Sequence, residues 1–288
     1  GDLTEAQSDT VVDAENRIVC PGFIDVHVHS ERTLVGGRDQ FSGTHQGITT
    51  HLLAPDGFGW APLSEKLAAE MWYYTNFACG ERPPPPSCSS PQEYLDLFTG
   101  TTPANVAPQV PHCAVRLAAM GWAPRAATEE ELDTMREATR SWMEVGATAL
   151  NLGLDYQPSA NATFEELVEL CKVAASYGGI YAAHLRYQDY GRSAAWDEII
   201  ELSRAADIAV HVSHERVDEE SLEKLERVER DGIDLTFESY LYPAGMTHGV
   251  MLLPMSYQAG SPEEVLARLN EPQARADCVP FLRDKLGV

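Results

Sequence analysis

Four histidines stand where side chains from separate strands could act on one point. His27 and His29 close the alternating segment Phe23 to His29, and their i, i+2 spacing directs both side chains to the same side of a strand. His184 and His214 end two later strand-like segments. Converging imidazoles suit zinc, which binds nitrogen, sulfur and carboxylate ligands. The pattern therefore predicts a metal site built from these four side chains.

Strand-like and helix-like segments alternate along the chain and would position the histidines. The expected strands are 23–29, 48–53, 104–110, 148–152, 180–184, 208–214 and 233–238. The expected helices are 62–74, 129–145, 163–177, 194–206 and 219–230. Repeated βα units imply a parallel sheet with right-handed crossovers, and seven units without a reversal favour a (β/α) barrel. In such a barrel functional side chains gather at the C-terminal ends of the strands, where all four histidines stand.

Local signals mark several helix ends. Thr163 followed by Glu166 three residues later predicts a capping box, and Ser64 predicts the start of an earlier helix. Glycine is favoured where a helix ends in the left-handed conformation. We expect such ends at Gly146, Gly178 and Gly232.

The chain divides into a short first segment and one large domain. Residues 1–20 contain two short β-like runs and are expected to be the remnant of a small β-sandwich segment; residues 21–288 form the barrel domain. Within it, residues 78–91 carry four consecutive prolines and are expected to form a surface excursion. After Pro254 only helix-like sequence remains, so the α/β barrel is expected to be truncated before its eighth strand.

Composition narrows the class of protein. The 288 residues include 44 acidic and 21 basic side chains, a net charge of −23 that disfavours nucleic acid and anionic membrane surfaces as partners. No apolar run approaches the ~18 residues of a membrane-spanning helix. The six cysteines are scattered, which is typical of reduced thiols in a cytoplasmic protein. Composition leaves the oligomeric state open.

An ordered set of motifs now gives the chain a family resemblance. Pro21 to His29 resembles the first-strand signature of the amidohydrolase superfamily, and the chain as a whole resembles the N-acyl-D-amino-acid deacylases, or D-aminoacylases. The resemblance runs from about residue 10 to about residue 280. Its further motifs are Gly47-Ile48-Thr49-Thr50, Gly57-Phe58, Gly153-Leu154-x-Tyr156-x-Pro158, Tyr177 to Arg186 and Val212-Ser213-His214.

The resemblance implies a zinc-dependent hydrolase that cleaves N-acyl-D-amino acids to a carboxylate and a free D-amino acid. It implies one or two divalent ions, one held by His27 and His29 and the other by His184 and His214. Metal-activated water would attack the scissile carbonyl of this small-molecule substrate. A bridging ligand would come from the loop after the second strand.

Asp56 stands where the family usually has a cysteine ligand. A carboxylate also binds zinc and bridges metals readily, so Asp56 is expected to replace that cysteine. The alternative is a turn residue before Gly57. His51, within the second strand, is expected to be buried or to support the ligands rather than bind metal.

The resemblance also suggests a substrate-binding set. Arg216 stands where the family has a lysine that pairs with the substrate carboxylate, and a guanidinium offers that carboxylate two parallel hydrogen bonds. Tyr156 and Tyr240 match tyrosines of the family's pocket. Arg186 could support the substrate carboxylate or Asp56. An acidic substrate side chain would need one of these arginines, or Arg192, as a partner.

Two departures from the family keep other readings open. The family's catalytic aspartate follows the eighth strand and is expected beyond Val288, so the catalytic residue is unknown; Glu238 is a weak substitute. A non-catalytic, truncated homologue is therefore one alternative. A hydantoinase-like or dihydroorotase-like cyclic amidohydrolase is another, although such relatives usually carry a carboxylated lysine on the fourth strand. Residues 148–156 contain no lysine.

Overall fold

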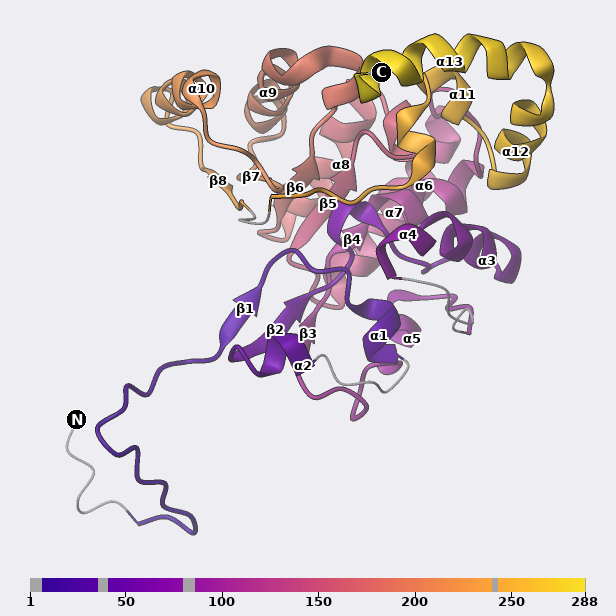
Figure 1. The fold of residues 1–288 in the computed structure, drawn as a ribbon. Coiled ribbons are helices and arrows are strands. Elements are labelled where there is room, and N and C mark those ends of the chain that lie inside the picture. Colours follow the sequence, from indigo (N-terminus) through magenta and orange to yellow (C-terminus); the bar gives the residue numbers. More distant parts are fainter. Residues whose placement is uncertain (1–6, 36–40, 80–85, 240–242, 288) are drawn as a thin grey trace.

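Two parallel sheets form the framework of the molecule, and helices flank them, while β1 lies at the edge (Figure 1). The computed structural model describes residues 7–35, 41–79, 86–239 and 243–287. The strands are β1 (Phe23–Asp25), β2 (Ile48–Leu52), β3 (Asn105–Ala107), β4 (Val110–Pro111), β5 (Ala149–Gly153), β6 (Ile180–His184), β7 (Val210–Val212) and β8 (Leu235–Phe237).

The helices follow the strands in alternation through most of the chain. The α-helices are α1 (Glu31–Val35), α2 (Phe41–Thr44), α3 (Glu65–Tyr74), α4 (Asn76–Cys79), α5 (Pro91–Asp96), α6 (His112–Met120), α7 (Glu129–Glu144), α8 (Phe164–Ser176), α9 (Tyr187–Ala206), α10 (Glu219–Arg230), α11 (Met255–Gln258), α12 (Pro262–Asn270) and α13 (Pro272–Leu286). The described residues also form three short 3-10 helices, η1 (Pro55–Gly57), η2 (Ser159–Asn161) and η3 (Gly249–Leu252).

The strands are parallel and run in chain order, as the βα alternation predicts. One sheet has the order β1-β2-β3 and the other β4-β5-β6-β7-β8. The expected strand 104–110 was wrong in one respect, because it is divided into β3 and β4. Pro108 lies at the break and has no amide hydrogen to donate. β3 therefore pairs with β2, whereas β4 pairs with β5.

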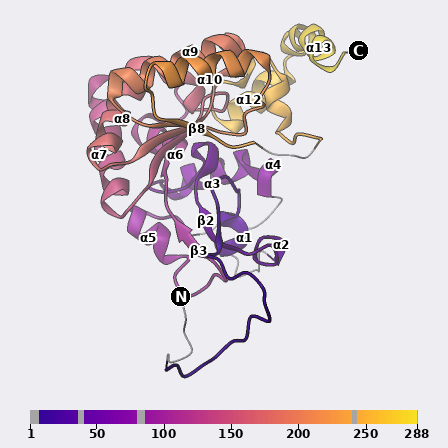
Figure 2. The ribbon, with the colours of Figure 1, turned by 90° about the vertical axis from the view of Figure 1, so that its left-hand side faces the viewer.

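The core lies between β4–β8 and the helices outside them. Trp142, Trp196, Tyr181 and Leu150 are among the largest fully buried side chains. Burial of an aliphatic side chain such as Leu150 contributes about 1.5–3 kcal/mol to stability. Figure 2 shows α7, α8, α9 and α10 in succession along this outer wall, and consecutive members of the row contact one another. The strands that lead to His184 and His214 are thus held by a continuous packed layer.

Most helix ends follow the local signals. Ser64 accepts a hydrogen bond from the Leu67 amide and caps α3. Thr163 caps α8 in the same way, but the Glu166 carboxylate binds His112 and Arg116 instead of completing the expected capping box. The predicted left-handed helix ends are confirmed by positive φ angles at Gly146, Gly178 and Gly232.

Residues 7–22 form no helix or strand and extend away from the body (Figure 1). Val12 and Ile18, from the two β-like runs, are exposed. The assignment of residues 1–20 to a sandwich remnant stays a prediction. The expected excursion at 78–91 lies partly outside the described residues, while its last residue begins α5. Beyond Pro254 the structure is helical, as expected.

Two further predictions concern membrane-spanning helices and the cysteine side chains. No helix in the described ranges combines the length and apolarity required to cross a bilayer. Cys88, Cys113, Cys171 and Cys278 are buried free thiols, whereas Cys20 is exposed.

Candidate functional site

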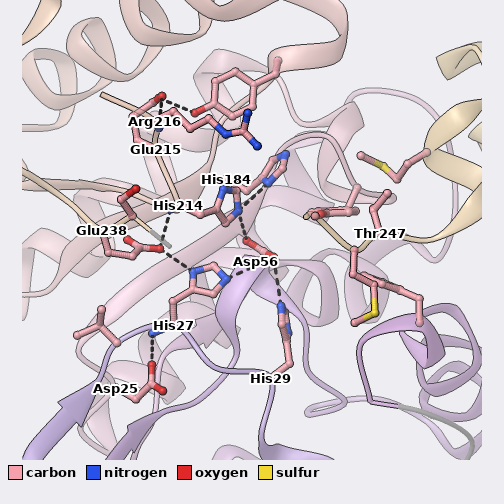
Figure 3. Close-up of a pocket in the computed structure, with 18 of the residues that line it drawn as sticks. Asp25, His27, His29, Asp56, His184, His214, Glu215, Arg216, Glu238 and Thr247 are labelled. Carbon is pink, nitrogen blue, oxygen red and sulfur yellow. Dashed lines mark hydrogen bonds and ion pairs between the residues drawn. The ribbon is translucent and has the colours of Figure 1, made fainter. Parts of the chain in front are cut away.

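The predicted metal ligands meet at the C-terminal ends of the strands (Figure 3). His27 and His29 follow β1, and Asp56 lies in η1 after β2. His184 is the last residue of β6, and His214 lies two residues beyond β7. All five line one cavity of about 1420 Å³. The structure therefore brings together the complete set of residues that the sequence singled out as ligands.

Asp56 is the centre of this cluster. Its Oδ2 lies 3.4 Å from Nε2 of His29 and 3.7 Å from Nε2 of His27, and its Oδ1 lies 3.7 Å from Nε2 of His214. Burial by itself would raise the pKa of Asp56, but the charge of His27 and the polar contacts of the neighbouring histidines hold that pKa well below its ordinary value. Asp56 is therefore an ionised, buried carboxylate.

A tight turn brings Asp56 into the cluster. Asp56 has φ of 55° and its neighbour Ala54 has φ of 62°, left-handed values that cost a non-glycine residue about 1 kcal/mol or more each. The amide of Ala54 donates to the buried carboxylate of Glu31, and this bond anchors the turn. The cluster is thus maintained against local backbone preference.

His27 is held by acids on two sides. Its Nδ1 lies 2.9 Å from Oε1 of Glu238, which follows β8, while its Nε2 faces Asp56. Burial lowers the pKa of His27, but the carboxylates of Asp56 and Glu238 outweigh burial and raise it to about 10. Glu238 also accepts the His214 amide at 2.8 Å and binds His211. Glu238 therefore orients the histidines instead of standing free.

His184 and His214 approach each other closely. Nδ1 of His184 lies 3.0 Å from Nε2 of His214, and Nε2 of His184 lies 3.0 Å from Oδ2 of Asp155. Sequence reasoning missed Asp155. The signal was available, because an acid stood at the variable position of the motif Gly153-Leu154-x-Tyr156, directly after a strand that leads to the site.

The donor set fits a divalent metal. One ligand atom from each of His27, Asp56 and His214 lies within 4.8 Å of the other two. Ligands at ~2.0–2.1 Å from a tetrahedral zinc are roughly 3.4 Å from one another, close to the separations around Asp56. Oδ1 of Asp56 is also buried without a hydrogen-bond partner among the described residues. A metal ion would satisfy that oxygen.

Only some of the predicted substrate-binding residues line the cavity. Arg216 and Tyr156 line the cavity. Arg186 does not line it, because its guanidinium donates to the carbonyls of Ala160 and Ala162 at 2.5 and 3.0 Å. Tyr240 lies outside the described residues.

Two other histidines lie buried away from the cavity lining. His112 lies between Ser159, at 2.7 Å from its Nδ1, and Glu166, at 3.1 Å from its Nε2. His51 is buried, and neither of its ring nitrogens has a hydrogen-bond partner among the described residues. Neither residue lines the cavity.

Comparison with known proteins identifies the family. The family described as "Amidohydrolase family" matches residues 10–286. The chain belongs to the amidohydrolase family. Among curated amidohydrolase relatives, the D-aminoacylase of Alcaligenes xylosoxydans xylosoxydans is 34% identical over 264 residues, 86% of this chain and 52% of the relative. The N-acyl-D-glutamate deacylase of the same organism is 31% identical over 258 residues, 86% of this chain and 51% of the relative.

Solved structures of related deacylases have a similar fold. The N-acyl-D-glutamate deacylase of Bordetella bronchiseptica, solved with zinc and a phosphonate that mimics the tetrahedral intermediate, has a TM-score of 0.72 at 31% identity, over 84% of this chain and 52% of that one. A D-aminoacylase structure has a TM-score of 0.72 at 27% identity, over 98% of this chain and 63% of that one. This amidohydrolase chain spans about half the length of the curated relatives it matches.

Proposed function

We propose that this amidohydrolase is a metal-dependent hydrolase of N-acyl-D-amino acids. The observation that supports this proposal is the convergence of three histidines, His27, His29 and His214, on the buried Asp56. His184 lies 3.0 Å from His214 in the same cavity, which Arg216 also lines. The D-configuration comes from the curated relatives, all of which act on D-amino acid derivatives by name.

One or two divalent ions would be held by the proposed ligands His27, His29, Asp56, His184 and His214. When bound, the metal lowers the pKa of a water molecule and polarises the scissile carbonyl. The chain's own part is to keep the ligands in place. Asp56 supplies a negative charge between the histidines, and Glu238 holds the ring of His27 through Nδ1.

Arg216 would bind the substrate carboxylate. Among the described residues its guanidinium has no hydrogen bond or ion pair, and its side chain is exposed at the cavity. A guanidinium can bind a carboxylate through two parallel hydrogen bonds and so orient the amide over the metal ligands. Phe77, Tyr156 and Met251 add an apolar part to the wall, against which the acyl group or side chain would pack.

The proposed substrate has a neutral side chain. Of the arginines that could meet a second carboxylate, Arg186 is bound to backbone carbonyls away from the cavity. Arg192 lines the cavity but already binds Glu215, Asp218 and the carbonyl of Arg216. Among the described residues that line the cavity, Arg216 is thus the guanidinium available to a substrate, and it would bind the carboxylate that all amino acids share.

The test combines metal content with turnover. Zinc would be added to the folded 288-residue chain, the excess removed by dialysis, and bound metal measured per chain. Release of free amine would then be followed with N-acetyl-D-leucine and with N-acetyl-L-leucine. We expect at least one zinc per chain and hydrolysis of the D-substrate only. A folded chain that retains zinc and hydrolyses neither compound would contradict the proposed activity, whereas a folded chain without zinc would contradict the metal site.

A further inference from the structure

Asp155 makes two contacts that together define the state of a neighbouring imidazole. It lies two residues beyond the end of β5, and its side chain is buried. Oδ2 of Asp155 lies 3.0 Å from Nε2 of His184, and Oδ1 accepts the backbone amide of Gln188, in the first turn of α9, at 2.9 Å. Both carboxylate oxygens are therefore engaged, one by a ring nitrogen and one by the backbone.

These contacts favour one position for the proton of His184. A carboxylate oxygen accepts hydrogen bonds, so the contact with Oδ2 of Asp155 is satisfied when Nε2 of His184 donates. A neutral imidazole carries one N–H, and its other nitrogen then holds a lone pair. Nδ1 is that nitrogen, and it lies 3.0 Å from Nε2 of His214 within the metal-ligand cluster.

Aromatic neighbours hold the same ring in place. The ring of His184 packs against Tyr156, with ring centres 4.9 Å apart, and against Tyr187, with centres 5.5 Å apart. These contacts restrict tilting of the ring. They do not distinguish its two nitrogens, however, because a ring turned by half a revolution would fill almost the same space. Asp155 supplies the distinction, since only Nε2–H can meet its carboxylate.

We propose that Asp155 is a positioning residue that holds His184 in the Nε2–H tautomer and presents Nδ1 as a metal ligand. The inference rests on the proposed metal-dependent function. A ligating histidine commonly donates its second ring N–H to a carboxylate, and loss of that partner lowers metal affinity about 10–100-fold. Here the carboxylate partner follows β5, whereas the histidine ends β6. A residue after one strand would therefore determine the tautomer of a ligand on the next strand.

The substitution Asp155→Asn tests this with almost no change in volume. The two oxygens of Asp155 face two N–H groups, the ring N–H of His184 and the amide of Gln188. The asparagine side chain has only one oxygen to accept from them, and its other terminal group is an NH₂ donor. With its oxygen toward the Gln188 amide, the new NH₂ group would donate to Nε2 of His184. The ring would then carry its proton on Nδ1 and lose its lone pair toward His214. The matched control is Asp189→Asn, which removes the same charge from an exposed position near the start of α9.

The first readout needs no metal and no turnover. Long-range ¹H–¹⁵N correlation spectra of the metal-free chain, with His184 assigned by a His184→Gln variant, report which ring nitrogen is protonated. We expect the Nε2–H tautomer in the unaltered chain and in Asp189→Asn, and loss of that preference in Asp155→Asn. An unaltered chain with its proton on Nδ1 would overturn the proposal without any Asp155 variant.

The second readout is zinc affinity, measured by competition with a chromophoric chelator on chains whose fold is checked by circular dichroism. We expect Asp155→Asn to bind zinc about 10–100-fold more weakly, and Asp189→Asn to bind as the unaltered chain does. Equal affinity in a folded Asp155→Asn would overturn the inference. Tight zinc binding and the expected tautomer in a chain without deacylase activity would instead contradict only the proposed reaction.

Discussion

At the scale of single residues, the site is defined by a negative charge enclosed by imidazoles. Asp56 is buried, and without metal its charge is balanced by His27, whose pKa is raised to about 10. Glu238, on the other side of His27, has its pKa lowered to about 2: burial raises that pKa, but hydrogen bonds from His211 and His27 outweigh the effect. At neutral pH a proton on His27 therefore occupies the place that a metal ion would take.

Proton release on zinc binding follows from this balance. Zinc binds the neutral imidazole, and His27 with a pKa near 10 is protonated at pH 7, so binding must displace its proton. We expect apparent zinc affinity to rise with pH, up to about tenfold per unit, until pH approaches the pKa of His27. Titration calorimetry at pH 7.5 in two buffers of different ionisation enthalpy measures the released protons. Binding with the same observed enthalpy in both buffers would contradict the prediction.

At the scale of elements, the backbone conformation of η1 determines the position of Asp56 in the site. The turn holds Asp56 in a left-handed conformation and packs against β5. Gly57 has φ of +72°, and a Cβ there would lie 2.7 Å from the carbonyl oxygen of Asn151. A glycine is needed at this position for two reasons, its φ angle and the close approach of the neighbouring strand. The position of Asp56 therefore depends on the contact between η1 and β5.

Gly57→Ala and Gly146→Ala form a matched pair that separates these two reasons. Gly146 also has a positive φ, +94°, but nothing lies within 4 Å of its added Cβ. We expect Gly146→Ala to cost about 1 kcal/mol from backbone strain alone. Gly57→Ala should cost clearly more, because its Cβ collides with backbone, and it alone should reduce bound zinc. Urea unfolding and metal content measure both effects. Equal stability losses with unchanged zinc in both variants would show that the contact with β5 does not position Asp56.

At the scale of the whole molecule, charge selects among substrates. The chain carries a net charge of −23, and the cavity wall includes Asp25, Glu215 and Glu238 beside Arg216. A substrate with a second carboxylate would meet this negative field without a second available guanidinium among the described residues. A neutral side chain avoids that cost.

Selectivity between two substrates checks this reading. We expect kcat/KM for N-acetyl-D-leucine to exceed that for N-acetyl-D-glutamate by tenfold or more at low ionic strength, about 1.4 kcal/mol or more in transition-state stabilisation. The ratio should fall on addition of ~0.3 M salt, because salt screens the repulsion of the dianion. Faster turnover of the glutamate derivative would contradict the assignment of the substrate side chain.

The sequence by itself determined the order of the parallel strands and the histidines that meet at their C-terminal ends. The strand Ile180–His184 has the predicted limits. The expected strand 23–29 was too long, because β1 ends at Asp25, and His27 and His29 face Asp56 from the irregular segment that follows it. The family resemblance added Asp56 in the place of a cysteine, and the structure locates it at the centre of the histidines.

Only the tertiary structure decided which partner each polar side chain meets. Arg186 donates to the carbonyls of Ala160 and Ala162 and not to the site. Glu166 contacts His112 and does not complete the capping box of its own helix. Asp155, which follows β5, contacts His184 at the end of β6. Periodicity is encoded over a few residues and can be read along the chain. A long or charged side chain instead takes the best donor or acceptor within its reach, and folding brings those groups together from distant parts of the sequence.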